Sequence, residues 1–365
     1  MSDGIALAPF RPNIWNRLLQ VIRKCKDRFA ALLCKIVNTR RIEFEVSALK
    51  ESTEVMECDK RKDHNKFIPA HSFKIDDLPK EHRSKDLHTL IILMAKLTGR
   101  IEVDVDSNNF KHGTGFIQRT RLQRGQCPCH ECQGRSGQKV FAVLTVTTVV
   151  HVFPNTRENN QFKINGKPED FTMLLNYNTE PVNERDTIYG WHLLETDKDI
   201  NERMDWCCIE FVTHNLTLAN EIKTNLTQYQ EMQLKVYDKA VKDKKLLKKD
   251  VDLVVVVGHP HGGIKKVSVG RKVGEPDPLK ELRDTQRWGC YKYDTPTCPG
   301  SSGSPILILG QPISGFGYWF GHPHNHSGND KHGFNISSIG VDFVVDDENH
   351  RDPTGSLSPA HCSVL

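Results

Sequence analysis

The chain has 365 residues, of which 37% are hydrophobic and 26% are charged. These proportions are ordinary for a globular protein of two to three domains, and they argue against disorder over most of the length. The formal net charge of +4 at pH 7 is too small to indicate nucleic-acid binding, and no apolar run approaches the roughly 18 residues of a membrane-spanning helix.

The N-terminal part carries an amphipathic pattern and lacks the features of a secretory signal. Basic residues interrupt every apolar stretch of the first 40 residues, so we expect a cytoplasmic protein that is not secreted. From residue 14 to residue 37, apolar residues recur at helical spacing on one face, and the opposite face is basic. Such a helix docks on the body of the protein, on a partner or on a membrane surface.

The eleven cysteines are an odd number, and they are unevenly distributed. Without an export signal, free thiols or metal ligands are favoured over a disulfide framework. The last cysteine, Cys362, begins the C-terminal sequence Cys-Ser-Val-Leu, which fits a prenylation motif. Because Ser363 is not aliphatic, a chance match is the alternative. A lipid on Cys362 and the basic helix would together supply the two weak signals that stable membrane anchoring needs.

Helical and strand-like patterns alternate along the rest of the chain. A polar linker precedes a predicted helix at 84–98, strand-like runs follow, and a second helical stretch ends in the basic sequence VKDKKLLKKD. The predicted organisation is a helical N-terminal segment with linker at 1–99, a β-unit at 100–218, a basic helical connector at 219–250, a second β-unit at 251–346 and a tail at 347–365. The many short strands separated by turns favour a mainly β fold of barrels or sandwiches.

The most informative string is the turn Cys-Pro-Gly-Ser-Ser-Gly-Ser-Pro at residues 298–305. A serine nucleophile needs a tight turn with backbone N–H groups near the developing oxyanion, and glycines beside Ser302 permit both. It also needs a general base and a carboxylate that orients the base. A β-branched strand runs directly into His151, and Asp205 opens the apolar strand DWCCIEF. These three residues are therefore candidates for a catalytic triad.

In these motifs the sequence resembles the chymotrypsin-like serine peptidases, whose triad has the order His, Asp, Ser. The run GTGF at Gly113–Phe116 is similar to a strand of the family's first barrel. The resemblance covers residues 100–346 and implies two six-stranded antiparallel β-barrels. It implies that Ser302 is the nucleophile, His151 the base and Asp205 the orienting carboxylate, with the N–H groups of Gly300 and Ser302 as oxyanion hole. The family's substrate-pairing strand corresponds by position to Ser314, Gly315, Phe316 and Gly317.

Two departures from the family pattern indicate an intracellular branch without zymogen activation. Ser301 stands where the secreted enzymes have the aspartate that binds a new N-terminus, and Val152 replaces the cysteine after the catalytic histidine. Pro296 occupies the position that sets the basic preference of trypsin, so cleavage after Lys or Arg is not expected. The chemistry requires no cofactor.

Cysteines and histidines gather at two places near these motifs. Cys127, Cys129 and Cys132 lie within six residues, and a structural zinc ion would take them as ligands, with His130, Cys207 or Cys208 as the fourth. Free loop thiols are the alternative, with Cys207 and Cys208 in the barrel core. The histidine-rich run Gly-His-Pro-His-Asn-His-Ser from Gly321 to Ser327 is expected to be a polar surface loop rather than a metal site.

The sequence thus predicts an active serine endopeptidase that acts on protein or peptide substrates. Its alternative is a catalytically inactive peptidase fold that serves as a binding or scaffold protein, and in a further alternative such a protein is membrane-anchored. No specific nucleic-acid partner is expected, because only the basic run at 242–249 would favour one.

Overall fold

In the computed structural model, the described residues all belong to the unit of residues 40–365. The structure describes residues 41–42, 46–47, 58–106, 109–129, 132, 139–153, 155–158, 161–164, 170–178, 187–193, 200–201, 205–242, 252–274, 277–283, 286–309, 313–314, 323–338 and 340–344. The predicted helix at 14–37, residues 243–249 of the basic run, and the tail with Cys362 lie outside them.

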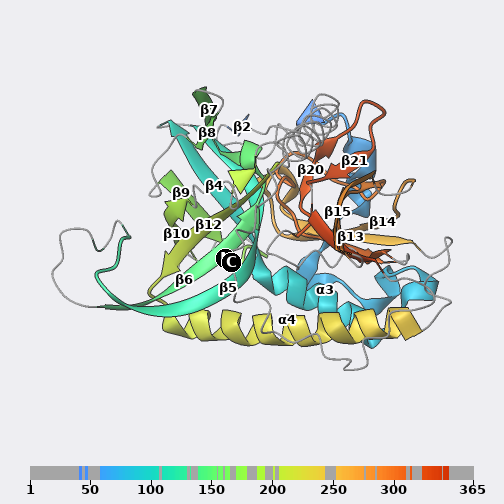
Figure 1. Ribbon diagram of the computed structural model, residues 1–365, viewed down its shortest axis with the longest axis horizontal. Helices are drawn as coiled ribbons and strands as arrows, with labels where there is room; N and C mark the ends of the chain where they lie inside the picture. Colours follow the sequence, from blue (N-terminus) through green and yellow to red (C-terminus); the bar gives the residue numbers. More distant parts are fainter. Residues whose placement is uncertain are drawn as a thin grey trace, which may run out of the picture. The chain divides into compact units, whose positions relative to one another are not determined.

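The first half of the described chain forms one large antiparallel sheet (Figure 1). Its strands are β4 (Thr98–Asp106), β5 (Asn109–Gly125), β6 (Lys139–Thr148), β9 (Phe171–Leu174), β10 (Thr187–Leu193), β11 (Ile200–Asn201) and β12 (Trp206–Thr213), and β2 (Val46–Ser47) pairs with β5. The order is β10-β9-β4-β5-β6-β12-β11, and β10 also pairs with β12. Six strands therefore follow one another in a ring of antiparallel pairings.

Between β6 and β9, a separate hairpin joins β7 (Asn155–Glu158) to β8 (Gln161–Ile164). The strands of the second half are divided among three four-stranded antiparallel sheets. One sheet has the order β1 (Arg41–Ile42), β20 (His326–Asn329), β21 (Asn335–Ser337) and β17 (Lys292–Tyr293). The next is β18 (Ile306–Leu309), β13 (Leu253–Gly258), β14 (Lys266–Gly270) and β3 (Ile68–Pro69). The third is β15 (Asp277–Arg283), β16 (Gln286–Cys290), β22 (Gly340–Val344) and β19 (Ile313–Ser314).

The mainly β, antiparallel class predicted from the sequence is therefore present. The described strands do not close into two six-stranded barrels, because those of the second half are distributed over separate sheets. Two short strands from the region before residue 70, β1 and β3, each add to one of these sheets. The sequence predicted a linker in this region.

Two α-helices lie among the described residues, and each begins at a side chain that caps it. α3 (Lys85–Leu97) starts after Ser84, whose Oγ accepts a hydrogen bond from the Leu87 N–H at 3.2 Å. α4 (Leu216–Lys242) starts after Asn215, whose Oδ1 accepts from the Leu218 N–H at 3.0 Å. Such caps satisfy N–H groups that have no partner within the helix. The remaining short turns are the 3₁₀ helices η1 (Arg61–Lys66), η2 (Ala70–Ser72), η3 (Ile75–Asp77), η4 (Lys80–His82), η6 (Val150–Val152) and η10 (Pro260–Gly262).

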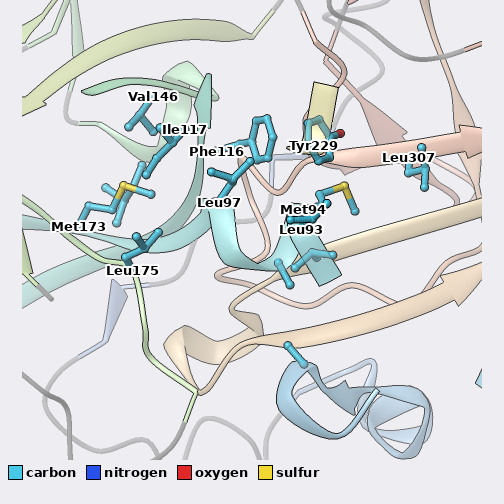
Figure 2. Close-up of a cluster of buried hydrophobic side chains, with 14 of the residues drawn as sticks. Leu93, Met94, Leu97, Phe116, Ile117, Val146, Met173, Leu175, Tyr229 and Leu307 are labelled. Atoms are coloured by element: carbon cyan, nitrogen blue, oxygen red, sulfur yellow. The ribbon is translucent and has the colours of Figure 1, made fainter. Parts of the chain in front are cut away.

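The two helices pack against each other, and α4 extends from α3 to the strands β5 and β6 (Figure 1). The main hydrophobic core lies where they meet the sheets. Figure 2 shows Met94 and Leu97 of α3 with Phe116 of β5 and Tyr229 of α4. The Phe116 and Tyr229 rings are 5.5 Å apart. Because strands from both halves contribute to this core, burial of its apolar surface holds the two halves together. Within the described part of the chain, no helix has the length and apolar character that crossing a membrane requires.

Candidate active site

His151 lies just beyond the end of β6. This strand lies between β5 and β12 in the first sheet and pairs with both, and most of its residues are buried. The chain then turns through η6, which places the His151 side chain at the edge of the sheet with only 5% of the residue exposed. The strand thus delivers a buried imidazole at a defined position.

Asp205 meets His151 from the neighbouring strand, because it directly precedes β12, the partner of β6. Its Oδ2 is 2.8 Å from His151 Nδ1, and its Oδ1 accepts a bond from the His151 backbone N–H at 3.3 Å. The backbone of Asp205 has a φ of 51°, in the left-handed region that aspartate tolerates better than most residues. The carboxylate therefore contacts both the ring and the backbone N–H of His151.

Ser302 completes the constellation from the second half of the chain. Its Oγ is 2.8 Å from His151 Nε2, and the residue is 3% exposed. Gly300 and Gly303 on either side have φ values of 85° and 87°, which favour glycine. A Cβ on Gly303 would lie 2.0 Å from the carbonyl oxygen of Thr114, so the turn also needs glycine for space.

Thr114 of β5 fixes the turn from the first sheet. Its Oγ1 donates to the carbonyl oxygen of Gly300 at 2.9 Å, and its N–H donates to that of Ser302 at 2.7 Å. Within the turn, the Ser301 N–H donates to the Cys298 carbonyl and the Ser304 N–H donates to the Ser301 carbonyl, while the Gly303 N–H donates to the carbonyl of His326 in β20. The threonine of the GTGF run thus connects the two halves at the site.

The sequence missed a fourth side chain at the site, Ser327 of β20. Its Oγ donates to Asp205 Oδ2 in a short contact. The only signal was its place in the histidine-rich run, which was expected to be a polar surface loop. That expectation is wrong for His324, His326 and Ser327, each at most 1% exposed. Tyr293 Oη lies 2.6 Å from His326 Nδ1, and the His326 carbonyl accepts from Gly303 N–H at 2.8 Å.

Of the four residues predicted to pair with substrate, the structure describes Ser314. Ser314 belongs to β19, which pairs with β22 at Phe343. Gly315, Phe316 and Gly317 lie outside the described residues. The strand whose side chain contacts Asp205 is β20.

The cysteine cluster predicted from sequence is assembled beside the first sheet. Cys127, Cys129 and Cys132 lie with His214 so that their four ligand atoms are all within 4.8 Å of one another. His214 Nε2 is 3.3 Å from Cys129 Sγ and 3.2 Å from Cys132 Sγ. His214, just beyond β12, was not among the predicted fourth ligands. Cys207 lies in the main core instead, Cys208 is buried in β12, and His130 is outside the described residues.

The thiols of this cluster differ in their tendency to ionise. Burial raises the pKa of Cys127, and it raises that of Cys129 to about 12. Burial acts in the same direction on Cys132, but the hydrogen bond from Lys139 Nζ at 3.2 Å and the neighbouring thiols outweigh it and lower its pKa. A divalent cation would reverse the first two shifts, because thiols that coordinate a metal are deprotonated.

A second cluster of possible ligands was not predicted. It consists of Cys58, His64, His261 and Cys298, again with ligand atoms all within 4.8 Å of one another. Burial is the main cause that lowers the pKa of His64, and the adjacent His261 adds to it. Neutral imidazole is the form that binds metals. Two groups of the described residues therefore have donor sets that could hold a metal such as zinc.

Comparison with known proteins gives a distant structural similarity to serine proteases. No family model and no curated protein matches the sequence. A serine endoprotease from Yersinia pestis is 9% identical with a TM-score of 0.35, over 72% of this chain and 63% of that one. The HtrA-type protease AlgW with a tripeptide is 12% identical with a TM-score of 0.33, over 70% and 58% of the two chains. The Rv3671c protease in its inactive form is 13% identical with a TM-score of 0.32, over 70% and 86%.

The chain thus spans less than two thirds of the first two proteases. Identities this low and TM-scores below 0.5 do not assign it to a family. Any function must therefore be argued from its own side chains.

Proposed function

We propose that the protein is a serine endopeptidase with Ser302 as its nucleophile. The observation that carries the proposal is the continuous hydrogen-bonded series from Ser302 Oγ through His151 to Asp205, with both ring nitrogens 2.8 Å from their partners. Hydrogen-bond reach between nucleophile and base, and between base and orienting group, is the geometric requirement for an activated hydroxyl. All three residues are less than 10% exposed, so water competes weakly for these bonds.

In the proposed reaction, Ser302 Oγ attacks the peptide carbonyl carbon while His151 Nε2 accepts the hydroxyl proton. Asp205 stabilises the resulting imidazolium through Nδ1. The tetrahedral oxyanion accepts hydrogen bonds from the N–H groups of Gly300 and Ser302. His151 then passes the proton to the leaving nitrogen as the C–N bond breaks, and an ester remains on Ser302. Water attacks this ester with the same base, which releases the acid and restores the serine.

The proposal extends to the fold and to substrate binding. The ring of six strands in residues 98–213 would be the first barrel of a trypsin-like peptidase, and the sheets of residues 253–344 the second. Peptides commonly bind such sites as an added strand, through main-chain hydrogen bonds to a sheet edge. The residues at 314–317 were predicted for this role. β20 supports the same role better, because its Ser327 contacts Asp205.

We include a structural zinc ion at Cys127, Cys129, Cys132 and His214 in the proposal. Three thiolates and one imidazole are a common donor set for closed, four-coordinate zinc. The site would fasten the insertion between β5 and β6 to the end of β12. It has no part in the chemistry at Ser302.

Labelling of the purified protein with a fluorophosphonate probe tests the nucleophile. The probe phosphonylates a serine only when its base is in place, so the wild type should label and Ser302→Ala should not. His151→Ala should lower the labelling rate by several orders of magnitude, because the base is removed.

Circular dichroism and thermal unfolding would establish that each variant is folded. A folded wild type that does not label would overturn the proposal and favour the alternative of an inactive peptidase fold that binds other proteins. Labelling that survives in Ser302→Ala would place the reactive group elsewhere.

A further inference from the structure

The Cys58 cluster brings together four side chains from three distant parts of the chain. Cys58 lies just before η1, and His64 lies within it. His261 lies in η10, after β13, and Cys298 is the first residue of the turn that contains Ser302. Cys298 is fully buried and His261 is 8% exposed. Cys298 is four positions before Ser302 in the same turn, so any ligand of the cluster would lie next to the candidate active site.

The distances between the donor atoms fit a tetrahedral zinc ion. With Zn–S of about 2.3 Å and Zn–N of about 2.05 Å, the edges of the tetrahedron are about 3.8 Å for S–S, about 3.6 Å for S–N and about 3.3 Å for N–N. The structure has 3.8 Å between the Cys58 and Cys298 sulfurs, 3.4 Å from Cys298 Sγ to His64 Nε2, and 3.3 Å between the Nε2 atoms of His64 and His261. All three kinds of edge agree within about 0.2 Å, the tolerance expected of a real site.

A disulfide between the two cysteines does not explain this arrangement. Disulfide sulfurs are about 2.05 Å apart, whereas these are 3.8 Å apart, and both cysteines are free thiols. A disulfide would also give no reason for two imidazole nitrogens to converge on the sulfurs. The donor set of two thiols and two imidazoles is the one that structural zinc uses in many small sites.

The backbone at the cluster supports the same interpretation. His261 has a φ of 56°, a left-handed conformation that costs a residue with a side chain on the order of 1 kcal/mol. This conformation directs its ring toward His64, with ring centres 5.0 Å apart, while its N–H donates to the Pro299 carbonyl at 2.6 Å. Strain of this kind persists where the surroundings require it, and a metal ligand is such a requirement.

The segment that carries Cys58 and His64 is further fixed to the second half by Lys60. Its Nζ donates to Thr297 Oγ1 at 3.3 Å, to Asn329 Oδ1 at 3.1 Å and to Asn335 Oδ1 at 3.3 Å. The segment therefore contacts the residue before Cys298 and the end of β20. These contacts of Lys60 help to hold Cys58 and His64 beside Cys298.

We infer that Cys58, His64, His261 and Cys298 form a Zn²⁺ site that fastens the segment at 58–66 to the nucleophile turn. The zinc ion takes the two sulfurs as thiolates and the two Nε2 atoms as neutral ligands, and two protons leave as it binds. The ion is structural, because four protein ligands leave no open position for water. Its effect on the reactivity of Ser302 rests on the proposed function, whereas the metal site itself does not.

Metal content of the purified full-length protein tests the site. The protein is prepared under reducing conditions, without added chelator, and zinc is measured by inductively coupled plasma mass spectrometry. With both clusters loaded, we expect two zinc ions per chain in the wild type. The double variant Cys58→Ser/His64→Asn should lose one, Cys127→Ser/Cys132→Ser should lose the other, and the combined variant should bind none.

His71→Asn is the matched control, because His71 is an exposed histidine in the same part of the chain. It should retain the wild-type zinc content. Cobalt substitution gives a second measurement, since the charge-transfer absorption of tetrahedral Co²⁺ grows with the number of thiolate ligands. The Cys58 cluster supplies two thiolates and the Cys127 cluster three, so the two variants should leave distinguishable spectra.

The inference is wrong if Cys58→Ser/His64→Asn retains the zinc content of the wild type. It is also wrong if peptide mapping finds Cys58 and Cys298 joined in a disulfide in metal-free protein. If the zinc is present, the same double variant should react with the fluorophosphonate probe several-fold more slowly than wild type. A wild type that holds zinc here but does not label would refute the proposed function and leave the metal site standing.

Discussion

At the scale of single residues, Asp205 combines an unusual backbone with three hydrogen bonds to its carboxylate. Its φ is positive, and its oxygens accept bonds from His151 Nδ1, the His151 backbone N–H and Ser327 Oγ. Three donors from two chain segments leave the carboxylate little freedom to rotate. In the proposed reaction they would place the imidazole proton on Nδ1, so that Nε2 accepts one from Ser302.

The substitution Asp205→Asn separates charge from backbone conformation. Asparagine tolerates the same φ, so we expect the variant to fold. Its amide can donate to Nδ1, which places the imidazole proton on Nε2 and removes the base. The rate of fluorophosphonate labelling should fall by about four orders of magnitude, as for the corresponding change in other triads.

Asp205→Ala is the control for the backbone, since alanine is less stable at this φ. It should lose thermal stability as well as reactivity, whereas Asp205→Asn should lose mainly reactivity. Near wild-type labelling in Asp205→Asn would show that the carboxylate does not orient the base.

At the scale of elements, the position of β20 decides which sheet edge a substrate could use. β20 pairs with β21 on one side and with β1 on the other, where Arg41 faces Asn329 and Ile42 faces Gly328. This second edge begins one residue after Ser327, the residue in contact with Asp205. The chain's own N-terminal region therefore occupies main-chain groups that an added substrate strand would need.

Removal of residues 1–44 is expected to increase turnover of an extended peptide substrate. The deletion takes away β1 but leaves β2 and the Cys58 cluster. Two paired residues are worth on the order of 1 to 2 kcal/mol, so the increase should be roughly tenfold in kcat/KM. Removal of residues 1–39 leaves β1 in place and is the matched control. Equal kcat/KM values for the two truncated proteins would contradict this interpretation.

The elements best predicted from sequence are those with strong local patterns. The helix at 84–98, the helix predicted from 219 and the strands next to His151 and Asp205 have clear periodicity, and each begins within a few residues of its predicted position. β20 was missed because its sequence His-Ser-Gly-Asn has no apolar alternation. Its burial comes from tertiary contacts that local sequence does not show.

The same limit applies to the candidate site. Each triad residue has a local signal, namely a strand end or a glycine-rich turn, and their order along the chain connects them. His214 and the Cys58 cluster have no such signal, because His214 lies 82 positions from Cys132 and Cys58 lies 240 positions from Cys298. The predictions for the helix at 14–37, for Cys362 and for membrane association concern residues outside the described part of the chain, and they stay predictions.

At the scale of the whole molecule, a buried lysine makes stability depend on pH. Lys265 is 1% exposed, and its Nζ donates to the Leu175 carbonyl at 2.7 Å. Burial lowers its pKa to about 7. In the unfolded chain the pKa of lysine is about 10.4, so between these values the unfolded state binds more protons than the folded state. The free energy of unfolding therefore rises with pH in this window. Below pH 7 Lys265 is protonated in both states, and the destabilisation caused by burying its charge is then complete.

Urea unfolding at pH 7 and pH 9 measures this effect. The free energy of unfolding of the wild type should rise by roughly 2 kcal/mol relative to that of Lys265→Met, because the substitution removes the titrating group. The variant should be the more stable of the two at pH 7 if methionine fills the same space. The same pH dependence in both proteins would show that Lys265 is not the group responsible.

The contact between Cys58 and Cys298 joins residues that are 240 positions apart. During synthesis at roughly 5 to 20 residues per second, the segment at 58–66 leaves the ribosome well before its partners at the nucleophile turn exist. The ring of strands up to residue 213 can form in the meantime, because its pairings are complete without later residues. Closing so long a loop is slow and comes late in folding. The serine turn is thus secured only after residues up to Cys298 and Ser302 have been made, and in the proposed peptidase this order would keep unfinished chains unreactive toward their neighbours.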